Sequence, residues 1–155
     1  MDKLFKIDFS KGFKKEDQLE MVRNEPAVLL KIVNQTEAIC LEAVKQNSYA
    51  LMFVQNQTEA ICLEAVKKKY KTLQYVKNQT EDIYLAAIEQ NYGALQYIKN
   101  QTEAMCLEVV KQCGHALKYV HNQTEGICLE AVKQYGSALE YVKNQTEAIC
   151  LEAVK

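Results

Sequence analysis

Apolar residues recur along the chain with the spacing of a helix that is buried on one side. In the stretch that begins at residue 34, Ile39, Ala43 and Val44 fall on one side of a helical wheel drawn at about 100° per residue. Glu42 and Lys45 fall on the remaining side. This pattern predicts an amphipathic helix, and it returns at intervals of 22 residues to the end of the sequence.

A shorter apolar pattern follows each of these segments. Within residues 93–99, Ala94, Leu95 and Ile98 share one side, which predicts a helix of about two turns. Turn-prone residues separate the two patterns in each unit. One leucine of each short helix is expected in the core: Leu51, Leu73, Leu95, Leu117 and Leu139.

The tetrapeptide Asn-Gln-Thr-Glu marks every unit. Its copies begin at positions 34, 56, 78, 100, 122 and 144. The twelve residues of 34–45, 56–67 and 144–155 are identical, which indicates recent tandem duplication. The repeat is therefore the main feature of this sequence.

This tetrapeptide has the composition of a junction between two helices. Asn34 suits the left-handed residue that ends one helix, Thr36 suits the N-cap of the next, and Glu37 suits its first turn. In an alternative frame Asn34 is the N-cap and Glu37 its capping-box partner. Stacked asparagine side chains are expected to hydrogen-bond from one turn to the next. The same capping role accounts for Asn-Gln-Thr, which is formally a glycosylation sequon.

The elements predict an all-α fold, an α-solenoid of 22-residue helix-turn-helix repeats with a long and a short helix in each unit. Residues 34–155 hold five full repeats and a terminal half-repeat in one solenoid domain. Residues 12–33 fit the same frame weakly and are interpreted as a degenerate N-terminal capping repeat. Residues 1–11 are expected to form an extended arm over the cap, with three apolar residues on one side: Phe5, Ile7 and Phe9.

The final half-repeat lacks a short partner helix. Its inward face, including Ile149, Ala153 and Val154, is expected to lose half of its cover. Either this helix caps the array, or two molecules meet through it. An exposed apolar area favours a homodimer through the C-terminal half-repeat.

The repeat also resembles a known family. The string Asn-Gln-Thr-Glu-Ala-Ile-Cys-Leu-Glu-Ala-Val-Lys-Gln, followed by Ala-Leu-Gln-Tyr-Val-Lys, resembles uncharacterised short-repeat proteins of giant DNA viruses and some bacteria, catalogued as a domain of unknown function. The resemblance covers residues 34–155. It implies an all-helical repeat fold and protein binding, and it assigns no catalytic residue.

Composition and charge narrow the function classes. The chain has 155 residues, 48% of them apolar and 25% charged, which is enough apolar content to bury a core. The formal net charge of −1 argues against a strongly basic nucleic-acid binder. The sequence has neither a signal-peptide pattern nor an apolar run long enough to span a bilayer, so a cytoplasmic protein without a membrane partner is expected, in the host cytoplasm if it is viral.

Candidate chemistry is sparse. Five of the cysteines share one repeat position and are expected to be small buried residues, too far apart for disulfides or a shared zinc ion. Cys113 and His115 form an isolated pair that is insufficient for a metal site. One position of the short helix is aromatic in every full repeat, and this aromatic ladder is expected to pack between repeats: Phe53, Tyr75, Tyr97, Tyr119 and Tyr141. The basic cluster Lys67–Lys71 is interpreted as a solvated turn. We find no paired catalytic carboxylates, no nucleophile with a base and no phosphate loop, so an enzyme is not expected, nor a cofactor or metal.

The positions that differ between units point to a candidate binding face. Variation concentrates in the turn between the helices and on one side of the short helix, where solenoids commonly bind proteins. Neutral drift at exposed positions is the alternative. The candidate protein-binding residues are Tyr49, Met52, Tyr70, Lys71, Gln74, Tyr92, Gln96, His115, Lys118, Tyr135 and Glu140.

Three functions remain open from the sequence. The first is a non-enzymatic protein-binding repeat scaffold, which includes the case of a viral or phage protein that binds and blocks a host or viral protein. The second is a nucleic-acid-binding helical array that reads one unit per base. The third is a purely structural, self-assembling protein. Low net charge disfavours the second.

Overall fold

The structure is a computed structural model that describes residues 6–8 and 11–155. The chain divides into two compact units, residues 1–90 and residues 91–155. Within each unit, long α-helices alternate with short 3₁₀ helices, and consecutive repeats pack helix against helix. The predicted all-α solenoid of long-helix and short-helix repeats is therefore confirmed.

The first unit begins with a pair of helices inside residues 12–33, the segment interpreted as a degenerate cap. The long helices are α1 (Lys15–Asn24), α2 (Glu37–Gln46), α3 (Glu59–Lys68) and α4 (Glu81–Gln90). The 3₁₀ helices are η1 (Pro26–Lys31), η2 (Ser48–Phe53) and η3 (Tyr70–Tyr75).

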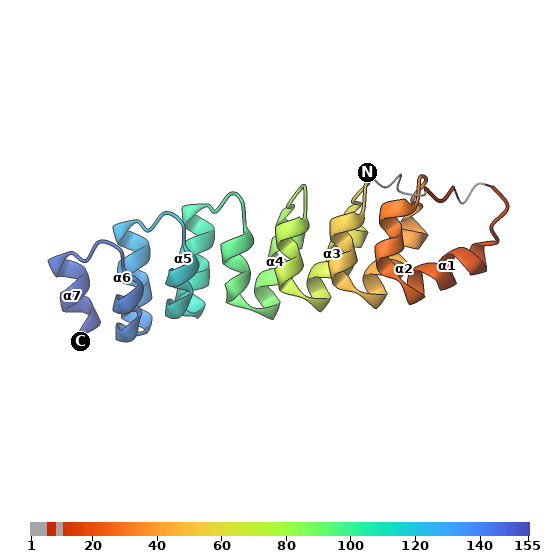
Figure 1. Ribbon diagram of the computed structural model, residues 1–155. Coiled ribbons are helices and arrows are strands. Elements are labelled where there is room, and N and C mark those ends of the chain that lie inside the picture. The colour runs from red at the N-terminus through yellow and green to blue at the C-terminus, as the bar shows by residue number, and fades with distance from the viewer. Residues whose placement is uncertain (1–5, 9–10) are drawn as a thin grey trace, which may run out of the picture. The chain divides into compact units, whose positions relative to one another are not determined.

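The second unit repeats the same order. Its 3₁₀ helices are η4 (Tyr92–Tyr97), η5 (Gly114–Tyr119) and η6 (Gly136–Tyr141). Its long helices are α5 (Glu103–Gln112), α6 (Glu125–Gln134) and α7 (Glu147–Ala153). Within each unit the loops that lead into the long helices lie along one edge, and the turns that follow these helices lie along the opposite edge (Figure 1).

Threonine, not asparagine, caps the long helices. The hydroxyl oxygens of Thr36, Thr58, Thr102, Thr124 and Thr146 accept the backbone N–H three residues on, at N–O distances of 3.2–3.5 Å. The glutamate that follows each threonine lies in the first turn, as predicted.

The predicted left-handed conformation of Asn34 is wrong. Among the described residues, only a glycine, Gly12, has a positive φ. The 3₁₀ helices end instead in an extended residue, as at Val54 with φ −75° and ψ 121°. The chain therefore turns into the next long helix through extended backbone, and no left-handed residue is required.

The core lies between the layer of long helices and the layer of short ones. Leu51, Leu73, Leu95 and Leu117 are fully buried, as predicted. The fifth of these leucines, Leu139 in η6, is only half-buried, in contrast to the prediction. It lies in η6, and among the described residues only the long helix α7 follows this short helix.

The described part of the N-terminal segment pairs with the first unit. The Ile7 amide donates to the Lys31 carbonyl at 2.7 Å, and the Val33 amide donates to the Ile7 carbonyl at 3.0 Å. These bonds form an isolated parallel bridge between Ile7 and Ile32. Phe5 and Phe9, the other apolar residues of the predicted arm, lie outside the described residues.

The last helix is better covered than the sequence suggests. Ile149 is 1% exposed, in contrast to the expectation that it loses its cover, because α6 and η6 both pack against α7. Val154 is 79% exposed and Leu151 is 58% exposed. Dimerisation through this half-repeat stays a prediction.

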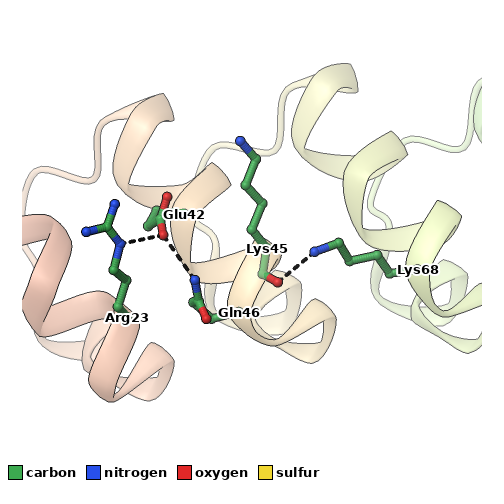
Figure 2. A network of polar contacts seen from close by, with 5 residues as sticks. All are labelled: Arg23, Glu42, Lys45, Gln46 and Lys68. Atoms are coloured by element: carbon green, nitrogen blue, oxygen red, sulfur yellow. Dashed lines mark hydrogen bonds and ion pairs between the residues drawn. The ribbon is translucent and has the colours of Figure 1, made fainter.

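Charged and polar side chains link the outer surfaces of the first three long helices. The Arg23 Nε donates to the Glu42 Oε1 at 2.7 Å, the Gln46 Nε2 donates to the same oxygen at 3.1 Å, and the Lys68 Nζ donates to the Lys45 carbonyl at 2.7 Å (Figure 2). The hydrogen bond from Arg23 is the main reason that the pKa of the Glu42 carboxyl is lowered. Such an exposed pair contributes about 0–1 kcal/mol, so the apolar core provides most of the stability.

Candidate interaction surfaces

The glutamine of the repeated tetrapeptide ties neighbouring repeats together. The Gln57 Nε2 donates to the Leu51 carbonyl in the preceding 3₁₀ helix, η2, at 3.2 Å, and to the Tyr75 carbonyl in the following one, η3, at 3.0 Å. Its Oε1 accepts the Lys77 backbone N–H at 2.9 Å and lies 3.9 Å from the Cys62 Sγ, which donates to it. One side chain therefore satisfies backbone groups at the ends of two successive short helices.

The same set of bonds recurs at three further glutamines, in both units: Gln35, Gln101 and Gln123. The expectation that stacked asparagines form the ladder from turn to turn is therefore wrong. Glutamine has one more methylene than asparagine, and its amide reaches the carbonyls on both sides.

Threonine and glutamate form a second ladder. The Thr58 hydroxyl donates to the Glu37 Oε1 at 2.7 Å, and the same bond joins Thr80 to Glu59 and Thr124 to Glu103. The threonine hydroxyl thus accepts a bond within its own helix and donates one to the preceding repeat. Three of the four residues of the motif consequently have a structural role.

The fourth residue, the asparagine, has a different environment. Its side chain is exposed in all six copies, and no hydrogen bond joins it to another residue in the described part of the chain. These asparagines are invariant in the sequence, where their residue type suggested a capping role, but the structure shows them exposed and not capping a helix. The six asparagines are Asn34, Asn56, Asn78, Asn100, Asn122 and Asn144.

A cavity lies between successive copies of the motif in each unit. In the second unit its volume is about 360 Å³, and it is lined by residues that include Asn100, Glu103, His121 and Asn122. In the first unit the equivalent cavity has a volume of about 190 Å³ and is lined by residues that include Asn56, Glu59, Lys77 and Asn78. Equivalent positions of the repeat therefore line a cavity in both units, with a different volume in each.

One set of the predicted binding residues faces solvent throughout. The fifth residue of each six-residue short helix is exposed in every full repeat, whereas the leucine that precedes it is fully buried in the first four repeats. Four residue types occupy this position in the five repeats, with glutamine in two of them: Met52, Gln74, Gln96, Lys118 and Glu140.

The predicted residues in the turns divide into two groups. Tyr49, Lys71 and Tyr135 are exposed. Tyr70, Tyr92 and His115 are half-buried and have structural contacts: for example, the Tyr92 hydroxyl donates to the Gln112 Oε1 at 3.4 Å, and the His115 ring packs 5.2 Å from that of Tyr135. The structure therefore brings only part of the predicted face to the solvent.

Packing explains some of the variation in the turns. At the position equivalent to Ser48, Gly114 is buried, and a Cβ added there would lie 2.5 Å from the Ala131 carbonyl oxygen. The corresponding Cβ at Gly136 would lie 2.2 Å from the Ala153 carbonyl oxygen. These glycines allow the next long helix to approach closely, so this position does not belong to a freely varying surface.

The aromatic ladder lies at the rim of the core. Phe53, Tyr75, Tyr97, Tyr119 and Tyr141 are all half-buried. The ring of Tyr75 meets that of Tyr49 edge to face at 6.2 Å, and the Lys118 ammonium lies 5.7 Å from the ring centre of Tyr141 in the next short helix. These contacts agree with the predicted packing between repeats.

The cysteine thiols are free, and most of them are buried as predicted. Burial, together with the nearby Glu37 and Glu59, raises the pKa of the Cys40 and Cys62 thiols to about 11. Cys150 is only half-buried, as is the unrelated Cys113. Among the described residues, no group of three or more His, Cys, Asp and Glu side chains is placed to hold a metal ion.

Alkylation should distinguish these thiols. At pH 8 a thiol with a pKa of about 11 is ionised in roughly one molecule in a thousand, so Cys62 should react with iodoacetamide far more slowly than Cys113. Its rate should rise about tenfold per pH unit from pH 7 to pH 9. Peptide mass mapping at short reaction times measures the alkylation rates of Cys62 and Cys113, and Cys113→Ser is the control. Equal rates for the two thiols in the folded protein would contradict the buried environment of Cys62.

Comparison with known proteins gives one match. A family model described as a domain of unknown function, DUF4116, matches residues 102–147. No curated protein and no solved structure matches this chain. The match and the repeated helices fit an uncharacterised helical-repeat family. No helix in the described ranges is both long and apolar enough to cross a membrane.

Proposed function

We propose that the chain is a non-enzymatic repeat scaffold that binds a partner protein through the variable, exposed side chains of its short helices. The observation that carries the proposal is the contrast between neighbouring positions in these helices. In η2, Leu51 is fully buried and invariant between repeats, whereas Met52 is 50% exposed and its equivalents are glutamine in two repeats, lysine in one and glutamate in one.

The chemistry of the exposed positions fits recognition of a protein. Tyr49 and Tyr135 add exposed aromatic rings beside this row, and Lys71 and Lys118 add cations. Tyrosine and methionine are enriched in protein interfaces, whereas lysine is depleted, so the exposed tyrosines and Met52 are the expected anchors. Solenoids use such rows, with one patch in each repeat, as extended binding surfaces.

The state of the thiols supports a non-enzymatic role. A cysteine nucleophile needs a lowered pKa, whereas burial raises the pKa of the Cys40, Cys62, Cys106 and Cys128 thiols.

The distribution of charge favours a protein over a nucleic acid. Each motif places an exposed glutamate at the start of its long helix, and these carboxylates would repel a phosphate backbone along the array. A viral or phage origin belongs to the same proposal and rests on the resemblance to the short-repeat proteins, and a cytoplasmic location belongs to it as an expectation from the sequence pattern.

The test is to make the variable row uniform without disturbing the packed turns. The variant carries Gln74→Met, Gln96→Met, Lys118→Met and Glu140→Met, and it keeps the closely packed Gly114 and Gly136. Affinity capture from the native host identifies the partner of the wild-type chain, and titration of that purified partner gives the affinities. Loss of binding by at least about tenfold, with unchanged circular dichroism, is the expected result.

A matched control carries four methionines on the long helices instead, at the exposed positions of Lys45, Lys67, Lys111 and Lys133. This control should bind as the wild type does. If the uniform variant folds and binds with full affinity, the variation is drift and the proposed surface is wrong.

A further inference from the structure

The invariant asparagines form a second surface, separate from the variable row. Each unit carries three of them: Asn34, Asn56 and Asn78 in the first, and Asn100, Asn122 and Asn144 in the second. They lie in the loops before the long helices, whereas the variable turns follow these helices at the opposite edge (Figure 1). A long helix of ten residues, about 15 Å, separates the two edges.

Contacts within the fold do not explain why these asparagines are invariant. The neighbouring glutamine, threonine and glutamate bind the repeats together, but the asparagine amides are exposed and bind no other described residue. The position before them varies as Gln55, Lys77, Lys99, His121 and Lys143, so duplication has not preserved every residue of these loops. We propose that the row of asparagines in each unit binds the main chain of an extended partner polypeptide in the polyproline II conformation.

The amide group suits a polypeptide main chain. A primary amide offers a carbonyl acceptor and N–H donors, and a main-chain peptide group offers the complementary pair. Two of these asparagines border each cavity between motifs, Asn56 and Asn78 in one unit and Asn100 and Asn122 in the other. Such contacts do not depend on the side chains of the ligand, which agrees with an invariant row.

The charges around the cavities favour a neutral backbone. Glu59 and Lys77 both line the first cavity, and Glu103 and Lys99 both line the second. Hydrogen bonds from Thr80 and Thr124 hold the two carboxylates in place, at O–O distances of 2.7 Å. A polyanion would meet a fixed carboxylate at each cavity, whereas a peptide group carries no net charge.

The repeat spacing selects the conformation of the polypeptide. Packed helices lie about 8–10 Å apart, so successive asparagines are expected to lie about that far apart. Three residues of polyproline II span about 9.3 Å and complete one turn, so every third residue presents the same side. A β-strand covers a similar length in three residues but presents its opposite side, because its side chains alternate with a period of two. With asparagines about 9 Å apart, a polyproline II segment presents the same side to each of them, whereas a β-strand does not.

Both the variable row and the asparagine row are proposed to bind a polypeptide, and a synthetic peptide tests the asparagine row independently. The probe is a fluorescent peptide of four Pro-Pro-Ala triplets, which forms polyproline II and keeps one N–H in each turn. A Gly-Ser peptide of equal length controls for conformation, and oligothymidylate represents the nucleic-acid alternative. Fluorescence anisotropy with the full chain measures the affinity for each.

The variant that tests the site is Asn100→Ala with Asn122→Ala, which removes both amides beside one cavity. We expect the wild-type chain to bind the Pro-Pro-Ala peptide more tightly than the Gly-Ser peptide, and the double variant to bind it at least about tenfold more weakly. The matched control, Gln46→Ala with Gln134→Ala, removes two exposed amides from the ends of long helices, outside both proposed surfaces, and should leave peptide affinity unchanged.

Four results would overturn the inference: no binding of the peptide by the wild-type chain, unchanged affinity in the asparagine variant, equal loss in the glutamine control, or tighter binding of oligothymidylate than of the peptide. A lowered melting temperature of the asparagine variant would show that these residues stabilise the fold and would also overturn it. Failure here leaves the variable row untouched, because the variant with uniform methionines tests that row against a different ligand.

Discussion

Replacing Leu51 with alanine is expected to lower the free energy of unfolding by about 2–5 kcal/mol. Leu51 is fully buried in η2, between α2 and α3, which both pack against this short helix. Removal of its side chain loses the apolar transfer free energy and leaves a cavity that the surrounding helices can only partly fill. For a chain of this size, each kcal/mol corresponds to about 2–4 °C in melting temperature.

The adjacent residue provides a matched control. Met52 is also a long apolar side chain in η2, but it is 50% exposed, so Met52→Ala is expected to change the free energy of unfolding by no more than about 0.5 kcal/mol. Urea denaturation followed by circular dichroism measures both variants. Similar losses for the two substitutions would show that the short helices are not anchored by their leucines.

The long helices and their caps are predictable because they depend on local sequence. The spacing of Ile39, Ala43 and Val44 identifies the buried side of the helix, and all three are buried in the structure. Thr36 and Glu37 act within a single turn, so their roles follow from the chemistry of helix termini. The burial of Leu51, Leu73, Leu95 and Leu117 follows in the same way from the repeat, whereas the half-buried Leu139 does not fit it.

The contacts between repeats are less predictable, because they join residues that are far apart in sequence. The Gln57 amide bonds to Leu51 and to Tyr75, which lies 18 residues on, and only the stacking of the repeats brings the two carbonyls together. Sequence reasoning therefore assigned the ladder to asparagine, the better-known turn residue. The cover of Ile149 by α6 and η6 was missed for the same reason.

The candidate site was predictable in part. Variation between repeats selected residues that are exposed in the structure, such as Met52 and Lys118, and also half-buried residues such as Tyr92 and His115, and the role of the exposed ones in binding stays a prediction. Variation alone does not distinguish free surface from compensated packing, as the close approach at Gly114 shows. The exposed asparagines carried a signal in their invariance, but a capping role for them was equally consistent with the sequence.

The glutamine ladder gives the second large effect, because one substitution there removes several hydrogen bonds at once. Gln57→Ala takes away the donor to two backbone carbonyls and the acceptor for the Lys77 amide. Unsatisfied, partly buried backbone groups cost about 1 kcal/mol or more each, so a loss of about 2–4 kcal/mol is expected. The neighbouring substitution Asn56→Ala removes an exposed amide that binds no other described residue and should cost no more than about 0.5 kcal/mol.

A charged replacement adds a dependence on pH with a defined sign. In Gln57→Glu the new carboxyl faces the carbonyl oxygens of Leu51 and Tyr75. These oxygens repel the ionised carboxylate, but they can accept a hydrogen bond from the O–H of the neutral carboxyl. Its pKa should therefore be higher in the folded chain than the ordinary value of about 4.3 in the unfolded chain. The folded state then holds the proton more tightly, so the destabilisation relative to the wild type should be largest near pH 7 and should shrink as the pH falls toward 4. Urea denaturation of both proteins at each pH measures the difference, and a difference that is constant or grows on acidification would show that the glutamine amide does not donate to these carbonyls.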